Sequence, residues 1–280
     1  MKKALYLLII CALALSLSAC GQKPTKLLTK QKTEESFAHL AVDYDVIECS
    51  YEDNNVATDK VINIKYPQIR KMIANSNNKA IETIINERIK GLVLSELSKL
   101  VLSSKDPPLT EFEGLGEASY VDKGTLEAEY TVTLQTNTIL SVRFIVTSFH
   151  QPQAYPLIGV RTINFDMHTG KTLELNDIVN VDSNFRSSFF DTFSNQRKYD
   201  ERVDDEFYDS INEYAKGILS IKSLRTCDEE SSVDFHSYLT TDTVGISIAV
   251  PFGGGSYALY EAKYSDVPLR TDFKELLRGN

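Results

Sequence analysis

The 280-residue sequence has no tryptophan and only four histidines and four cysteines. No histidine lies three to five residues from another, which is the spacing that paired metal ligands on one element commonly show. The Gly-x-Ser-x-Gly string of serine hydrolases and the loop pattern of EF-hand calcium sites are also absent. We therefore predict no catalytic constellation, no metal site and no cofactor. The histidines are His39, His150, His168 and His236.

Long apolar runs are scarce too, and the one at the N-terminus is short. Lys2 and Lys3 precede an apolar stretch over residues 4–17, which leads into Ser18, Ala19 and Cys20. A basic start, an apolar middle and a small-residue cleavage site are the layout of a secretory signal. A membrane-spanning helix needs roughly 20 apolar residues, so we predict a cleaved signal peptide over residues 1–19.

The Leu-Ser-Ala-Cys string over residues 17–20 resembles the lipobox of bacterial lipoproteins. The resemblance implies that Cys20 becomes the first mature residue and carries a diacylglycerol on its thiol. An ordinary signal peptide followed by an incidental cysteine is the alternative. Lipidation predicts an extracytoplasmic protein anchored to a bacterial membrane, on the periplasmic face of the outer membrane in a Gram-negative cell. Residues 20–41 are rich in charge, and we expect them to form the lipidated cysteine and a flexible tether.

The charge balance of the chain is acidic. The sequence has 30 basic and 39 acidic residues, and loss of residues 1–19 removes two lysines. The mature chain then has 28 basic residues and a formal net charge of −11. Nucleic acids are recognised by lysine and arginine, so this balance argues against a nucleic-acid partner. It favours solubility and electrostatic steering toward a basic partner.

Two cysteines remain after the signal and the lipid site are set aside. Cys49 and Cys227 could pair in an oxidising exterior. A disulfide requires Cα atoms roughly 4.4–6.8 Å apart, and the sequence does not fix that distance. Two free thiols are the alternative, because unpaired cysteines are often buried.

The hydrophobic pattern predicts an α+β fold. Residues 78–101 carry isoleucine and leucine at steps of three and four, which is typical of an amphipathic helix, and Pro67 is expected to end the strand before it. Two further helices are predicted near residues 182–193 and 204–221, with a short tail helix at 273–277. Alternating β-branched and aromatic residues predict the strands. These cover residues 43–51, 59–66, 117–121, 126–134, 139–149, 160–165, 172–175, 232–239, 243–251 and 257–264.

Together these elements predict an antiparallel sheet meander with helices packed on it, in two sub-lobes. The N-terminal α+β lobe is expected over residues 42–150 and the C-terminal α+β lobe over residues 151–275. The short turn Asp166–Lys171, with Gly170 available for a positive φ, is expected to form a hairpin.

Several strings in order resemble the extracytoplasmic module of RsiV-type anti-sigma factors, which is shared by the accessory domain of PdaC-type peptidoglycan deacetylases. The resemblance covers roughly residues 43–270, with the first lobe like the PdaC-type accessory domain and the second like the RsiV-type module. It implies an α+β fold and a cell-envelope role, the binding of lysozyme or wall material. No sigma-binding segment or deacetylase domain is seen, so neither activity is carried over. The strings are Ile62–Ile69, Thr138–Phe144, Tyr155-Pro156, Thr162–Lys171, Pro251 and Tyr264–Val267.

From these features we expect a non-catalytic binding module for a lysozyme-like protein or peptidoglycan. Aromatic side chains anchor interfaces and sugar rings, so Tyr155, Tyr257 and Tyr260 are the predicted ligand surface. The alternative is an enzyme that modifies wall glycans, a deacetylase or hydrolase. Its carboxylates would come from the acidic clusters at residues 204–206 and 228–230, although a solvated helix start and a loop are the favoured interpretation of these clusters.

Overall fold

The computed structural model describes residues 42–55, 60–71, 76–100, 124–150, 155–192, 194–195, 205–228, 235–250 and 256–279. These residues belong to one compact unit, Leu40–Asn280. The predicted signal peptide, Cys20 and the tether lie outside the described residues, as does the predicted strand over residues 117–121. Within the described ranges, no helix combines the length and apolar character that crossing a membrane requires.

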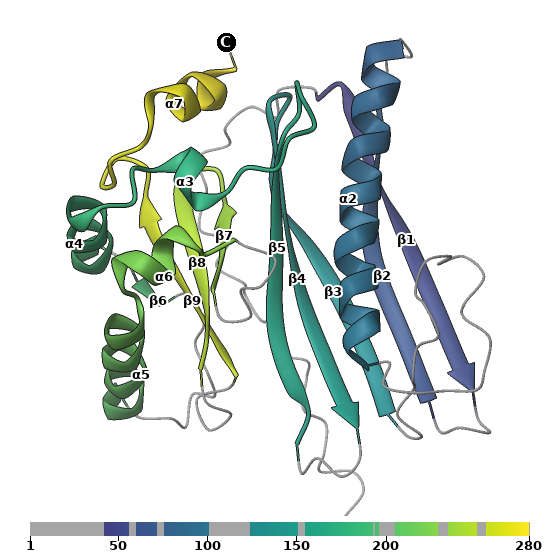
Figure 1. Ribbon diagram of the computed structural model, residues 1–280, viewed down its shortest axis with the longest axis horizontal. Coiled ribbons are helices and arrows are strands. Elements are labelled where there is room, and N and C mark those ends of the chain that lie inside the picture. The colour runs from purple at the N-terminus through teal and green to yellow at the C-terminus, as the bar shows by residue number, and fades with distance from the viewer. Residues whose placement is uncertain are drawn as a thin grey trace, which may run out of the picture. The chain divides into compact units, whose positions relative to one another are not determined.

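The fold is α+β, as the sequence predicts, and is built on two sheets (Figure 1). The first sheet has five strands in the order β1-β2-β3-β4-β5, and the second has the order β6-β9-β8-β7. The strands of the first sheet are β1 (Tyr44–Asn55), β2 (Lys60–Lys71), β3 (Gly124–Gln135), β4 (Ile139–His150) and β5 (Leu157–Asp166). Those of the second are β6 (Ser194–Asn195), β7 (Phe235–Leu239), β8 (Thr243–Ala249) and β9 (Tyr257–Lys263).

One helix covers the first sheet, and shorter helices pack on one side of the second (Figure 1). The long helix α2 (Ser76–Leu100) follows β2 and leads to β3. β2 and β3 pair in parallel, whereas every other pair in the two sheets is antiparallel. A parallel pair needs a long crossover connection, and α2 supplies it. The remaining helices are α3 (Leu175–Ile178), α4 (Ser183–Thr192), α5 (Asp205–Ile218), α6 (Ile221–Arg225) and α7 (Thr271–Arg278).

The apolar stripe of α2 packs on one face of the first sheet. Ile81, Ile85, Ile89 and Val93 are buried at three- and four-residue steps and belong to the same core as Leu126 of β3. This spacing places their side chains on one side of the helix. Ile84, which the pattern also assigned to the stripe, is 45% exposed. It instead lies against Gly170, where an added Cβ would come within 3.2 Å of the isoleucine and φ is +73°.

β2 continues through Pro67 to Lys71, so the prediction that Pro67 ends the strand is wrong. The parallel pairing of β2 with β3 stops at Ile64, so Pro67 needs no N–H on that side. Beyond it, side chains of α2 take over the role of a neighbouring strand. Asn86 Oδ1 accepts from Ile69 N at 2.8 Å, and Asn86 Nδ2 donates to Ile69 O at 3.0 Å.

The second sheet is buried on both faces. The helices contribute Phe185, Phe189 and Phe273 to the large core on one side, and β9 contributes Tyr260. On the other side, Tyr238, Tyr257 and Leu259 form a smaller cluster with Val160 of β5. Tyr238 lies directly across Gly245, where an added Cβ would come within 2.2 Å of the tyrosine ring.

Buried polar side chains join the two sheets. Ser141 Oγ donates to Asn164 Oδ1 at 2.7 Å, and Asn164 Nδ2 donates to Ser237 O at 3.1 Å. Leu239 N donates to Ser141 Oγ at 3.0 Å, and Thr162 also donates to Ser237 O. Side chains of β4 and β5 therefore satisfy backbone groups of β7. The predicted lobe boundary at residues 150 and 151 falls between β4 and β5, which are adjacent strands of one sheet.

Candidate functional site

The three tyrosines predicted as a ligand surface lie in different environments. Tyr155 is 60% exposed. Tyr257 and Tyr260 are buried, so their assignment to a ligand surface is wrong. Both lie on β9, an internal strand whose two faces pack against the two cores described above. The Tyr260 hydroxyl donates to Asn212 Oδ1 at 2.9 Å, which is a structural bond.

The two cysteines of the predicted body are free thiols, so the pairing alternative does not hold in this structure. Cys49 is half-buried on β1 opposite Tyr66. Cys227 is buried in the core beneath the second sheet. Burial raises the pKa of both thiols, most strongly that of Cys227, which disfavours the reactive thiolate.

Of the two acidic clusters, the structure describes the side chain of Asp228, whereas those of Asp205 and Glu206 are not described. Asp204, Glu229 and Glu230 lie outside the described residues. Asp228 Oδ2 accepts from Ser237 Oγ at 2.6 Å and from Leu175 N at 2.7 Å, and its Oδ1 accepts from Ser237 N at 2.7 Å. This carboxylate ties α3 to β7. Burial raises the pKa of Asp228 to about 6 in spite of these bonds.

The described part of the chain contains no group of three or more histidine, cysteine, aspartate or glutamate side chains that could hold a metal ion. His168 lies in the hairpin turn, and its side chain is 56% exposed. His236 is buried on β7, and its Nε2 lies 3.2 Å from Arg161 Nη1. The arrangement of these two histidines is therefore that of a turn residue and a hydrogen-bonded core residue.

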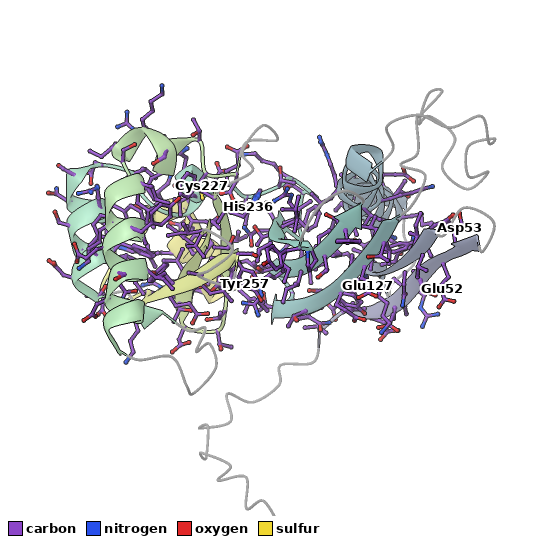
Figure 2. All side chains as sticks on the ribbon, turned by 90° about the horizontal axis from the view of Figure 1, so that it is seen from below. Glu52, Asp53, Glu127, Cys227, His236 and Tyr257 are labelled. Atoms are coloured by element: carbon purple, nitrogen blue, oxygen red, sulfur yellow. The ribbon has the colours of Figure 1, made fainter. Side chains whose placement is uncertain are left out.

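A more distinctive surface lies on the first sheet, on the side away from α2. Leu126 and Ala128 of β3 face the α2 core, so Glu127 and Glu129, which alternate with them, face the opposite way and are exposed. Figure 2 shows Glu52 and Glu127 on this side of the sheet. We call the side chains Glu48, Glu52, Glu127 and Glu129 the acidic sheet face.

Strand pairing places Glu52 and Glu127 on one surface, and alternation along β3 places Glu129 with them. Glu52 is the partner of Asn63 on β2, and Asn63 is the partner of Glu127 on β3. Cross-strand partners project to the same face of a sheet. Lys65 stands among them and donates to Glu129 Oε1 at 2.9 Å. That bond and the charge of Glu129, followed by the charges of Glu48 and Glu52, raise the pKa of Lys65.

The acidic sheet face is open because the second sheet covers the other half of the first. The second-sheet strands contact mainly β4 and β5, whereas Glu52 of β1 and Glu127 and Glu129 of β3 are exposed. Four carboxylates around one lysine leave a surface with excess negative charge. The sequence did not single it out, because its members come from separate strands and only the parallel β2–β3 pairing brings them together.

Comparison with known proteins gives fold neighbours only. No family model and no curated protein matches the chain. The structure is similar to crystal structures of two DUF3298 family proteins. The one from Pseudomonas aeruginosa PAO1 is 11% identical, with a TM-score of 0.46, covering 83% of this chain and 96% of that one. The one from Bacteroides fragilis NCTC 9343 is 14% identical, with a TM-score of 0.44, covering 86% and 98%. With TM-scores below 0.5, no functional conclusion follows from them.

Proposed function

We propose that this protein is a cell-envelope lipoprotein whose body is a non-catalytic binding module for a basic, lysozyme-like protein or for peptidoglycan. The anchor is Cys20, on the basis of the Leu-Ser-Ala-Cys string. The binding role follows from the resemblance to RsiV-type and PdaC-type modules. The observation that carries the choice of a basic protein is the open acidic sheet face.

A protein-sized partner fits this surface better than a small ligand does. The face extends across three neighbouring strands, which are held together by the sheet and supported from behind by α2. Rigid, complementary charge on such a face accelerates association and selects the partner. A mature net charge of −11 adds long-range attraction toward a basic protein.

The direct test is binding of hen-type lysozyme to the purified chain at low and at high salt. We expect binding at low salt that weakens as salt rises, since exposed charges are screened. Glu52→Gln with Glu127→Gln should weaken low-salt binding by roughly three- to tenfold. Neither residue makes a hydrogen bond or ion pair that the fold needs among the described residues. Absence of binding at either salt would remove this partner.

The control is Asp209→Asn with Glu275→Gln, which removes the same two charges from exposed positions on α5 and α7. Steering by net charge alone predicts equal losses in both double variants, whereas recognition through the acidic sheet face predicts a loss only in the first. The anchor is tested separately. Cys20→Ser should abolish palmitate labelling and release the protein from the membrane fraction, and a labelled, membrane-bound variant would refute lipidation.

A further inference from the structure

A cavity of ≈ 350 Å³ opens at the end of the first sheet, where five segments meet. It is lined by Asp43 before β1, Lys71 at the end of β2, Asn77 and Asn78 in the first turn of α2, and Asn137 between β3 and β4. The hairpin after β5 closes it with Met167 and His168. Its volume lies within the roughly 300–1,000 Å³ of small-molecule sites.

Hydrogen bonds between distant segments hold the walls of this sheet-end cavity. Asp43 N donates to Asn137 Oδ1 at 2.7 Å, and the Tyr44 hydroxyl donates to Thr136 O at 2.9 Å. Lys71 Nζ donates to Met167 O at 3.3 Å. The cavity is therefore preformed by contacts that join β1, the β3–β4 turn, β2 and the β5 hairpin.

Lys71 places its ammonium group at the cavity without an ion-pair partner among the described residues. Its ammonium lies 5.5 Å from the centre of the Tyr44 ring, and it donates one bond, to a carbonyl. No carboxylate within the described ranges approaches it to ion-pair distance. The nearby Glu82 is engaged elsewhere, since Oε2 accepts from Lys71 N at 2.9 Å and Oε1 accepts from Lys79. Two of the three ammonium donors are left for a ligand.

Asp43 presents the complementary charge. It is exposed at the cavity wall, and among the described residues its carboxylate makes no hydrogen bond or ion pair. Its charge acts on Lys71 at a distance, so the two groups are near each other without being paired. Asn77, Asn78 and Asn137 line the space, and an asparagine side chain carries both hydrogen-bond donors and an acceptor.

We propose that the sheet-end cavity binds a small zwitterion, an α-amino acid or a short peptide with free ends, with the ligand ammonium at Asp43 and the ligand carboxylate at Lys71. The asparagine side chains would contact the peptide amide. The inference goes beyond the proposed function and uses no residue of the acidic sheet face, so the two can fail separately.

The test uses the full chain in detergent, with alanyl-alanine as the probe and the Ile81 and Met167 methyl NMR signals as the readout. Both side chains line the cavity. Alanyl-alanine should shift these signals and bind about tenfold more tightly than either blocked analogue, N-acetyl-alanyl-alanine or alanyl-alaninamide. Free alanine, run in parallel, distinguishes an amino-acid site from a peptide site.

Two variants assign the ends of the ligand. Asp43→Asn should erase the penalty for N-acetylation and keep the penalty for amidation, and Lys71→Met should do the reverse. Asp45→Asn, which removes a carboxylate that pairs with Arg70 outside the cavity, should behave like the unmodified protein. Asp43 is exposed, so its variant reports even if the Lys71 variant fails to fold. Absence of methyl shifts at millimolar dipeptide, or equal affinity for all three peptides, would overturn the site.

Discussion

The two sheets differ in how many of their faces are covered by other elements. This difference decides which strands are wholly buried and which expose alternate side chains. In β9 of the second sheet, consecutive residues from Tyr257 to Tyr260 are all buried. In β3 of the first sheet, burial alternates, with Leu126 and Ala128 buried and Glu127 exposed. The residues of one strand are therefore buried on both faces, whereas the other strand has one buried face and one exposed face.

The largest expected effect comes from consecutive truncations in β9. Leu259→Ala should cost about 2–5 kcal/mol of unfolding free energy and Tyr260→Ala about 3–5 kcal/mol, because each leaves a cavity in a separate core. Urea denaturation followed by circular dichroism measures both. If either variant loses little unfolding free energy, one face of the second sheet is open. The contrast in coverage between the two sheets would then be wrong.

A somewhat smaller effect is expected where the two sheets are joined. Asn164→Ala removes the amide that bridges Ser141 and Ser237 and leaves buried polar groups unsatisfied, at about 3 kcal/mol. Asn63→Ala, on the open side of the first sheet, is the matched change and should stay within about 0.5 kcal/mol. Equal losses of unfolding free energy in the two variants would show that the polar contacts between the two sheets do not form a buried network.

Two carboxylates that accept hydrogen bonds from strand backbones, one in each sheet, extend the comparison to the pH dependence of stability. Glu82, which accepts from Lys71 N in the first sheet, has its pKa lowered, first by the bond from Lys79 and then by the bond from Lys71. Asp228, which accepts from Ser237 in the second, has its pKa raised to about 6 because burial outweighs its hydrogen bonds. A cation neighbours the first carboxylate, and the second relies on neutral donors.

The signs of the two pH dependences are therefore opposite. Glu82 contributes stability that is present above its unfolded pKa and lost as pH falls through the lower folded pKa. Asp228 favours the folded state below its unfolded pKa of roughly 4, and that advantage is lost as pH rises through about 6. Its full size is on the order of 3 kcal/mol, from a shift of about two pKa units.

Urea denaturation from pH 3 to pH 8 should resolve the two groups. The stability gap between the unmodified protein and Glu82→Gln should narrow toward pH 3. The gap for Asp228→Asn should narrow toward pH 8, and carbon NMR of the Asp228 carboxyl should titrate near 6. If the stability differences of the two variants from the unmodified protein change in the same direction with pH, the contrast between Glu82 and Asp228 is wrong.

Local periodicity predicts most of the elements, because each depends on residues close in sequence. The spacing of the isoleucines predicts α2, and the alternation of residues predicts β3, β4 and β8. The prediction at Pro67 is wrong because proline is tolerated within β2 where no strand pairs on its other side. Where the pairing of β2 with β3 stops is not encoded locally. The role of Glu82 is not visible in the sequence either, because a charged residue of a helix gives no local sign that it accepts from the end of β2.

The sites depend on long-range packing and were harder to predict. Tyr257 and Tyr260 are aromatic residues of a strand-rich segment, and no local signal states that helices and a second sheet cover them. The acidic sheet face and the sheet-end cavity each assemble residues from three or more elements. Burial of a strand face is set by what packs on it, and only the three-dimensional structure supplies that information.

The smallest expected effect lies on the open face itself. Glu127→Gln should change the unfolding free energy by less than about 0.5 kcal/mol, because the side chain is exposed and its carboxylate has like-charged neighbours. Leu126→Ala, the adjacent change on the same strand, should cost about 2–5 kcal/mol. If Glu127→Gln is destabilising by more than 1 kcal/mol in urea denaturation, the acidic sheet face has a structural role, and its loss of lysozyme binding could not be assigned to recognition. A neutral result leaves the carboxylate free to serve a partner, which is the condition that a binding surface must meet.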